Sequence, residues 1–201
     1  MPTAEEITKH HDAEPDHHPW VGERPAPVPI RVVAYDDSWP VHYERTAAQI
    51  RDVLGEVAIA VEHVGSTSVP GLAAKPTIDI DLTVADPSDE GSYVPALERV
   101  GFKLVIREPS WHEHRALQRQ GDPSTNLHVF GPDCPEVIRH RMFREWLRAH
   151  PEERELYARA KLEAAAAVTD QRGIMMDYNR HKEPVLRAIY ERMFRANGLL
   201  P

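Results

Sequence analysis

Cysteine, long apolar runs and excess positive charge are all scarce in this 201-residue sequence. The single cysteine, Cys134, can form no internal disulfide, which agrees with a reducing compartment such as the cytoplasm. The longest wholly apolar runs, Val57 to Val61 and Ala164 to Val168, are far shorter than the roughly 20 residues that a membrane-spanning helix needs. The first residues also lack the apolar stretch of a secretory signal peptide. We therefore expect a cytoplasmic domain with no membrane partner.

The charge balance limits the possible ligands. Lys and Arg number 24 against 32 Asp and Glu, which gives a formal net charge of −8. Broad binding to a nucleic-acid backbone needs clustered cations, so it is not expected here. A small anionic ligand that a few placed groups hold is compatible with this balance.

Residues 1 to 29 differ in composition from the rest of the chain. They contain six of the 18 prolines and four of the 12 histidines, with few large apolar side chains. Such a segment has little surface to bury, so we expect a disordered or loosely packed N-terminal arm. We assign its histidine pairs no role, and we place one domain over residues 30 to 201.

Hydrophobic periodicity predicts strands and helices up to about residue 130 and a helical C-terminal part, which together indicate an α+β fold. Residues Thr77 to Val84 alternate between polar and apolar, as a half-buried strand requires. A kink or break is expected just before Pro184. The other predicted strands are 30–35, 57–64, 102–106, 115–119 and 127–130, and the predicted helices are 40–54, 93–100, 135–149, 152–168 and 174–197.

Two aspartates and a glycine-serine turn are the main candidates for chemistry. Asp79 and Asp81 share one strand face, so both carboxylates can approach one hard cation such as Mg²⁺. Gly65 and Ser66 end the preceding strand, and a glycine there lets backbone N–H groups approach phosphate oxygens. This combination favours metal-assisted phosphoryl transfer over the alternative, in which the two acids merely face solvent.

The run from Val61 to Asp81, VEHVGSTSVPGLAAKPTIDID, resembles the signature of the GrpB family of nucleotidyltransferase-like proteins. Three further segments are similar to that family: Val33 to Pro40, Asn126 to Val129 and Phe143 to Pro151. The resemblance implies a minimal nucleotidyltransferase fold, which is a mixed β-sheet flanked by helices. It places Gly65, Ser66 and Thr67 at the phosphates and Asp79 and Asp81 at the metal.

The resemblance also suggests supporting residues. Larger superfamily members usually carry a third carboxylate on a later strand, where we expect this chain to offer His128. Tyr178 and Lys182 match a Tyr-x-x-x-Lys pattern of the family's last helix, and this spacing puts both on one helix face. Lys75 and Arg115 are further candidates for neutralising phosphate charge.

The segment Trp111 to Arg115 offers an alternative class of site, a zinc site. His112 and His114 on an extended segment would share a face as two zinc ligands, with His63 or His128 as a third. For this segment we favour a loop at the edge of the cleft, from which Arg115 reaches phosphate. For His63 we favour a hydrogen-bonded structural role.

The leading hypothesis is therefore an enzyme that binds a nucleoside triphosphate with Mg²⁺ or Mn²⁺ and transfers a nucleotidyl group to an unknown small acceptor. Asp79, Asp81 and His128 would form its catalytic centre. The alternative is a non-catalytic module for a nucleotide or a CoA-like ligand. The missing third acid favours that alternative, as does the occurrence of GrpB-like segments in dephospho-CoA kinases.

Overall fold

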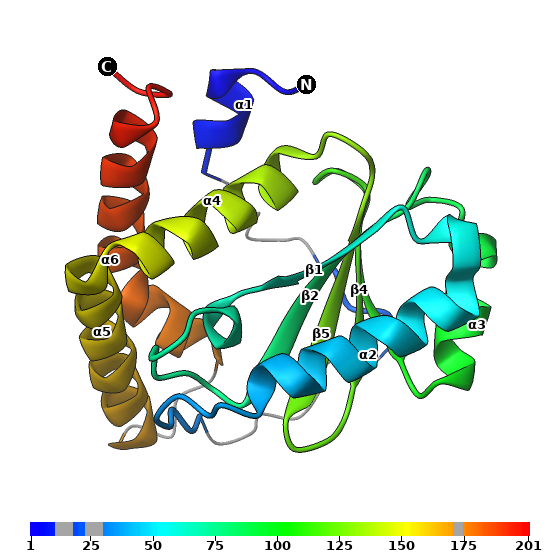
Figure 1. Ribbon diagram of the computed structural model, residues 1–201, viewed down its shortest axis with the longest axis horizontal. Coiled ribbons are helices and arrows are strands. Elements are labelled where there is room, and N and C mark those ends of the chain that lie inside the picture. The colour runs from blue at the N-terminus through cyan, green and yellow to red at the C-terminus, as the bar shows by residue number, and fades with distance from the viewer. Residues whose placement is uncertain (11–17, 23–29, 171–174) are drawn as a thin grey trace.

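The computed structural model describes residues 1–10, 18–22, 30–170 and 175–201. Its centre is a five-stranded mixed sheet in the order β1-β2-β5-β4-β3, flanked by helices (Figure 1). This confirms the predicted α+β class. The strands are β1 (Ala60–Val64), β2 (Thr77–Thr83), β3 (Lys103–Glu108), β4 (His114–Arg119) and β5 (Ser124–Phe130). The helices are α1 (Ala4–Thr8), α2 (Trp39–Leu54), α3 (Val94–Arg99), α4 (Pro135–Ala149), α5 (Pro151–Asp170) and α6 (Met175–Ala196).

Strands β2 and β5 pair in parallel, whereas the other neighbouring strands pair antiparallel. The register sets Asp79 opposite Asn126 and Asp81 opposite His128. Because side chains alternate along a strand, these four residues share one face of the sheet, and Ile80 and its apolar neighbours lie on the other.

The apolar face of β2 packs against α2 and α3. Ile78, Ile80 and Leu82 are at most 1% exposed and form one cluster with Ile50 of α2 and Leu97 of α3. Helices α4, α5 and α6 stand on the opposite face, where their side chains meet the aspartates (Figure 1). The sheet therefore separates an apolar core from a polar layer.

The N-terminal arm differs from its prediction in the parts that the structure describes. Ile7 of α1 is 8% exposed and packs with Met193 and Phe194. Farther along, Trp20 forms an isolated bridge with Ile106 at the edge strand β3. One buried apolar side chain and one main-chain bridge thus attach the described parts of the arm, which the low average hydrophobicity concealed. The histidines at 11 and 17 lie outside the described residues.

One local prediction was also wrong, because the strand expected over residues 30–35 is reduced to one bridge between Val33 and Ala74. Of the kink or break expected just before Pro184, the break does not occur, since Pro184 lies inside α6 and does not end it. Its ring removes the N–H that would bond to the carbonyl of Arg180, but both residues are exposed, so water can satisfy that carbonyl. No helix among the described ranges is both long and apolar enough to cross a membrane.

Candidate functional site

The glycine-serine turn lies directly against the first aspartate. Gly65 has a positive φ of 67°, and a Cβ atom added there would lie 2.4 Å from Asp79 Oδ2. Only glycine allows this approach without strain. The turn continues as a short 3₁₀ segment, Ser66–Ser68, in which Ser66 lines a cavity together with Gly65 and Asp79.

Thr67 does not have the predicted phosphate-binding position. It is fully buried, and its hydroxyl donates to the Thr77 carbonyl at 3.1 Å. The same oxygen lies 3.1 Å from His63 Nε2, which can therefore donate to it. His63 is stacked on Tyr43 at 4.5 Å, and burial lowers its pKa to about 4. Thr67 and His63 thus join the turn to β2 and α2, as the structural role predicted for His63 requires.

The two aspartates face the same side of the sheet but have different surroundings. Asp79 lines the cavity, and its Oδ1 accepts a hydrogen bond from Asn126 at 2.9 Å. Asp81 is 1% exposed, and its Oδ2 lies 2.9 Å from Nδ1 of His140 on α4. The other oxygen, Asp81 Oδ1, is buried with no hydrogen-bond partner in the described part of the chain. Only Asp79 therefore has the predicted position beside Ser66.

Histidines surround Asp81. Burial alone would lower the pKa of His140, but the charge and hydrogen bond of Asp81, with Glu136, raise it to about 9. Its imidazolium is thus the cation that faces Asp81. For His128 burial dominates and lowers the pKa to about 4, so this side chain is neutral. A hydrogen bond of 3.1 Å joins His128 Nδ1 to His114 Nε2, and Glu108 accepts from His114 Nδ1 at 2.7 Å.

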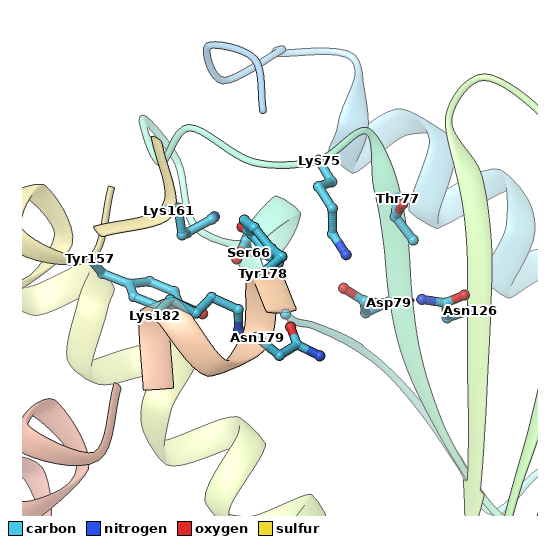
Figure 2. A pocket seen from close by; sticks show the side chains of 11 residues that line it. Ser66, Lys75, Thr77, Asp79, Asn126, Tyr157, Lys161, Tyr178, Asn179 and Lys182 are labelled. Carbon is cyan, nitrogen blue, oxygen red and sulfur yellow. Dashed lines mark hydrogen bonds between the residues drawn. The ribbon is translucent and has the colours of Figure 1, made fainter. Parts of the chain in front are cut away.

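Three lysines converge on the cavity beside Asp79, which has a volume of about 180 Å³. Lys75 precedes β2, Lys161 comes from α5 and Lys182 from α6 (Figure 2). Two tyrosine rings lie among the ammonium groups: Lys182 is 5.9 Å from the Tyr157 ring centre and 5.6 Å from that of Tyr178. Attraction between cation and ring helps to hold these like charges together.

Lys161 is the most perturbed of these lysines. It is 2% exposed, and its ammonium donates to the Ala73 carbonyl. Burial, and then the charges of Lys182 and Lys75, lower its pKa to about 7. Burial also lowers the pKa of Lys75. An anion in this cavity would compensate these charges, so the arrangement suits a ligand with several negative charges.

Sequence reasoning identified Lys75, Tyr178 and Lys182 at this cavity but missed Lys161. A signal for it exists, because Tyr157 and Lys161 repeat the same Tyr-x-x-x-Lys spacing one helix earlier. It also missed His140, which no local pattern distinguishes from other polar positions of α4.

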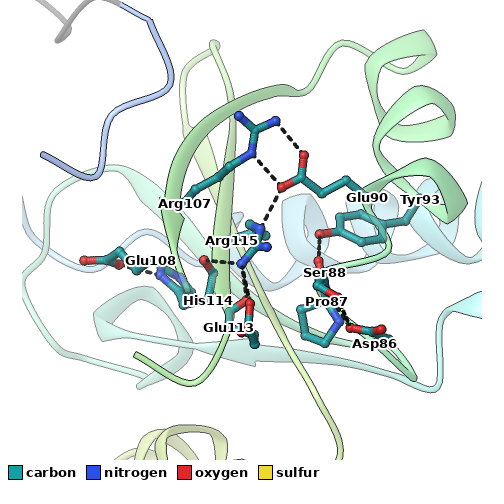
Figure 3. Close-up of polar contacts among 10 residues, drawn as sticks. All are labelled: Asp86, Pro87, Ser88, Glu90, Tyr93, Arg107, Glu108, Glu113, His114 and Arg115. Atoms are coloured by element: carbon teal, nitrogen blue, oxygen red, sulfur yellow. Dashed lines mark hydrogen bonds and ion pairs between the residues drawn. The ribbon is translucent and has the colours of Figure 1, made fainter. Parts of the chain in front are cut away.

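Arg115 is not brought to this site. It is the neighbour of His114 on β4, so alternation turns it to the opposite face of the sheet. There it is 5% exposed, and its guanidinium contacts Glu90 at 2.7 Å and the Glu113 carbonyl at 2.7 Å (Figure 3). Arg107 joins the same Glu90 carboxylate at 2.6 Å. The predicted contact of Arg115 with phosphate is therefore wrong, and its charge stabilises the junction of β3, β4 and the segment before α3.

The zinc alternative also fails on geometry. His112 lies in the turn before β4 with a positive φ of 55°, while His114 points to His128. His63 is on the opposite face of the sheet. Across the described ranges, no three His, Cys, Asp or Glu side chains are grouped so that they could hold a metal ion.

Comparisons with known proteins show to which family the chain belongs. Residues 29–192 match the family model of the GrpB protein, and the chain belongs to this family. A UPF0157 protein of Halalkalibacterium halodurans is 52% identical over 146 residues, covering 72% of this chain and 74% of that protein. A UPF0157 protein of Streptomyces coelicolor is 38% identical, covering 84% and 86%.

A similar structure has been solved. The crystal structure of the conserved protein GrpB from Enterococcus faecalis superposes with a TM-score of 0.73 at 28% identity, covering 83% of this chain and 99% of that one. Part of the chain is also similar to a longer enzyme. A dephospho-CoA kinase of Mycolicibacterium paratuberculosis is 29% identical and covers 83% of this chain, which spans 46% of that protein.

Proposed function

We propose that this protein binds the triphosphate of a nucleotide together with Mg²⁺ or Mn²⁺ and transfers the nucleotidyl group to a small acceptor. The observation that carries the proposal is the cavity in which Lys75, Lys161 and Lys182 face Asp79 and the Gly65 turn. Three cations opposite one carboxylate attract a polyanion, while the carboxylate provides a place for the metal that such a polyanion carries.

The aspartate pair fits a hard cation in its chemistry. Mg²⁺ prefers oxygen ligands and usually takes only one or two carboxylates, with water and substrate phosphates as the rest. Asp79 is held by Asn126, and Asp81 Oδ1 is a buried oxygen with no hydrogen-bond donor in the part of the chain described. Asp79 and Asp81 would therefore hold the metal. Bound there, it would neutralise phosphate charge and make the α-phosphorus more electrophilic.

The chain's own groups then have separate tasks. The lysines bind the phosphates that leave, and the backbone at Gly65 and the Ser66 hydroxyl bind the oxygens nearest the turn. Tyr157 and Tyr178 keep the ammonium groups in place and exclude water. Neutral His128, which is in register with Asp81, can accept a hydrogen bond from an acceptor hydroxyl.

Binding without transfer is the second candidate, and a specific observation favours it. Strand β5 offers Asn126 and His128 in register with the aspartates, and no carboxylate. On the other neighbouring strand, β1, the carboxylate of Glu62 lies opposite Asp81 but is paired with Arg144 at 3.6 Å. A carboxylate that is paired with a cation is a weaker base for activating an acceptor. The nucleotide or a CoA-like ligand would then be held and not consumed.

The test compares the parent with Asp79→Asn and Gly65→Ala by calorimetric titration with MgATP and the other nucleoside triphosphates. Asp79→Asn keeps the shape but removes the charge, so we expect at least a tenfold loss of metal-dependent affinity, in line with a lost metal ligand. Gly65→Ala should have a similar effect, because its Cβ would meet Asp79 Oδ2 at 2.4 Å. The control Asp89→Asn removes an exposed acid before α3 and should bind as the parent does.

Incubation with labelled triphosphates and a metabolite pool separates transfer from binding. A labelled product that Asp79→Asn does not form supports transfer, while binding without any product supports the second candidate. If the parent binds no triphosphate with either metal, the proposal is wrong.

A further inference from the structure

A second, larger cavity adjoins the lysine cavity. It has a volume of about 450 Å³, and Asn179 and Lys182 of α6 line both cavities. The lysine cavity, at about 180 Å³, is smaller than the roughly 300 Å³ or more typical of sites that enclose organic ligands. A ligand whose phosphates lie beside Lys182 therefore has room for its organic part only on the other side of Asn179.

Two large aromatic side chains, Trp111 and Tyr190, line the second cavity. Trp111 stands edge-on to His114 at 5.0 Å and to Phe130 at 6.0 Å, which fixes its ring. Tyr190 of α6 contacts the ring of His10 at 5.8 Å. Rigid rings of this kind provide surfaces on which a planar group can stack.

The charged groups of this cavity are paired with one another. Arg139 lies 2.8 Å from Glu136, and Arg187 lies 2.6 Å from Glu183. Apart from Lys182, which the two cavities share, the lining therefore has equal numbers of acidic and basic groups, in contrast to the lysine cavity. Its composition suits a neutral, ring-bearing group that is attached to the phosphates.

The N-terminal arm forms part of this wall. Arg139 of α4 is 5% exposed and donates to the main-chain carbonyls of Ile7, at 2.9 Å, and Lys9. These bonds place His10 at the cavity. The family match begins at residue 29, so this wall comes from a segment outside the conserved family region.

We infer that the second cavity is the subsite for the nucleobase and ribose of the nucleotide, with Trp111 and Tyr190 as its ring contacts and the arm as its closing wall. The inference rests on the proposed function, because it takes the triphosphate to lie among the lysines. Beyond the proposed function, it gives the nucleobase a binding position and gives the N-terminal arm a part in recognising it.

The experiment titrates the full chain with inorganic tripolyphosphate and with nucleoside triphosphates, both with Mg²⁺. The parent should bind its preferred nucleotide about tenfold or more tighter than tripolyphosphate, the order of one stacked base. Trp111→Ala and the cavity-filling variant Leu186→Trp should reduce this ratio toward one while tripolyphosphate affinity stays unchanged, which also shows that they are folded. Trp111→Phe should restore much of the ratio.

Leu162→Trp is the matched control for bulk, since Leu162 is an exposed residue of α5, and it should keep the ratio of the parent. If the parent binds tripolyphosphate and nucleotides equally, or if Leu186→Trp keeps the parent's preference, the subsite is elsewhere and the inference is overturned while the proposed function stands. If the parent binds neither ligand, the proposed function itself has failed, and the inference fails with it.

Discussion

The same strands form both faces of the sheet, but one face packs into the apolar core and the other carries the polar groups of the candidate site. On the face toward α2 and α3, Ile78, Ile80 and Leu82 meet other apolar side chains with at most 1% exposure. On the face toward α4, α5 and α6, the alternate residues of β2, Asp79 and Asp81, are held by hydrogen bonds to Asn126 and His140. One residue along the strand separates the two environments.

This difference shows how the fold divides stability from chemistry. Burial of apolar surface on the first face drives folding, while buried charges on the second face add little or oppose it. The polar layer is therefore placed where covering helices can satisfy it, and where one carboxylate oxygen is left with no hydrogen bond in the described part of the chain. A substitution on the apolar face should mainly lower stability, whereas a substitution on the polar face should mainly weaken ligand binding.

The largest expected effect is on the apolar face. Ile80→Ala removes a fully buried side chain and should lower the free energy of unfolding by about 2 to 5 kcal/mol. Asn126→Ala, on the polar face, removes the hydrogen bond to Asp79 and should lower it by only about 1 kcal/mol. Urea denaturation of both variants measures the difference.

Ligand binding should show the reverse order. Folded Ile80→Ala should bind MgATP as the parent does, whereas Asn126→Ala should bind it more weakly because Asp79 is no longer held. Equal losses of stability in the two variants would show that the faces are not divided in this way.

An intermediate effect is expected from the arm. Deleting residues 1–10 removes the packing of Ile7 and leaves buried Arg139 without its carbonyl partners, so we expect a loss of about 1 to 3 kcal/mol. The composition of the arm alone predicts almost no loss. Thermal melting of the truncated chain and of Ile7→Ala decides between these expectations. A melting temperature unchanged in both would show that α1 does not pack in solution.

The smallest effect concerns protons. Lys161 has a folded pKa of about 7 against its usual 10.5, so between these values the unfolded chain binds more protons and stability rises with pH. His140, with its pKa raised from 6.5 to about 9, has the opposite sign: its stabilisation is present below pH 6.5 and is lost as pH rises through 9. Because the two groups change stability in opposite directions with pH, the protonation of Lys161 has to be measured directly.

A bound triphosphate should favour the protonated form of Lys161, so binding at pH 8 should take up as much as one proton. Calorimetry in two buffers with different heats of ionisation measures this uptake. Lys161→Met should abolish it. An uptake that persists in Lys161→Met would assign the proton to another group.

Local pattern predicted most elements of this fold but not the contacts between distant ones. The alternation in Thr77 to Val84 was enough to place the aspartates on one face. The spacing of Tyr178 and Lys182 put both on one helix face, and both line the cavity. Arg115 was misplaced because its contact with Glu90 joins residues 25 positions apart, which no local period records. His140 and Lys161 reach the site through helix packing alone. The one buried side chain in the described parts of the arm, Ile7, escaped an argument based on average composition.

Arg139 holds the arm through main-chain carbonyls of Ile7 and Lys9, which every amino acid possesses. Residues 1–10 can therefore change most of their side chains and keep this attachment, provided that an apolar residue stays at position 7. The attachment of the arm therefore does not depend on the side chains that would contact a ligand. New side chains near position 10 can be tried at the larger cavity without loss of the attachment that presents them.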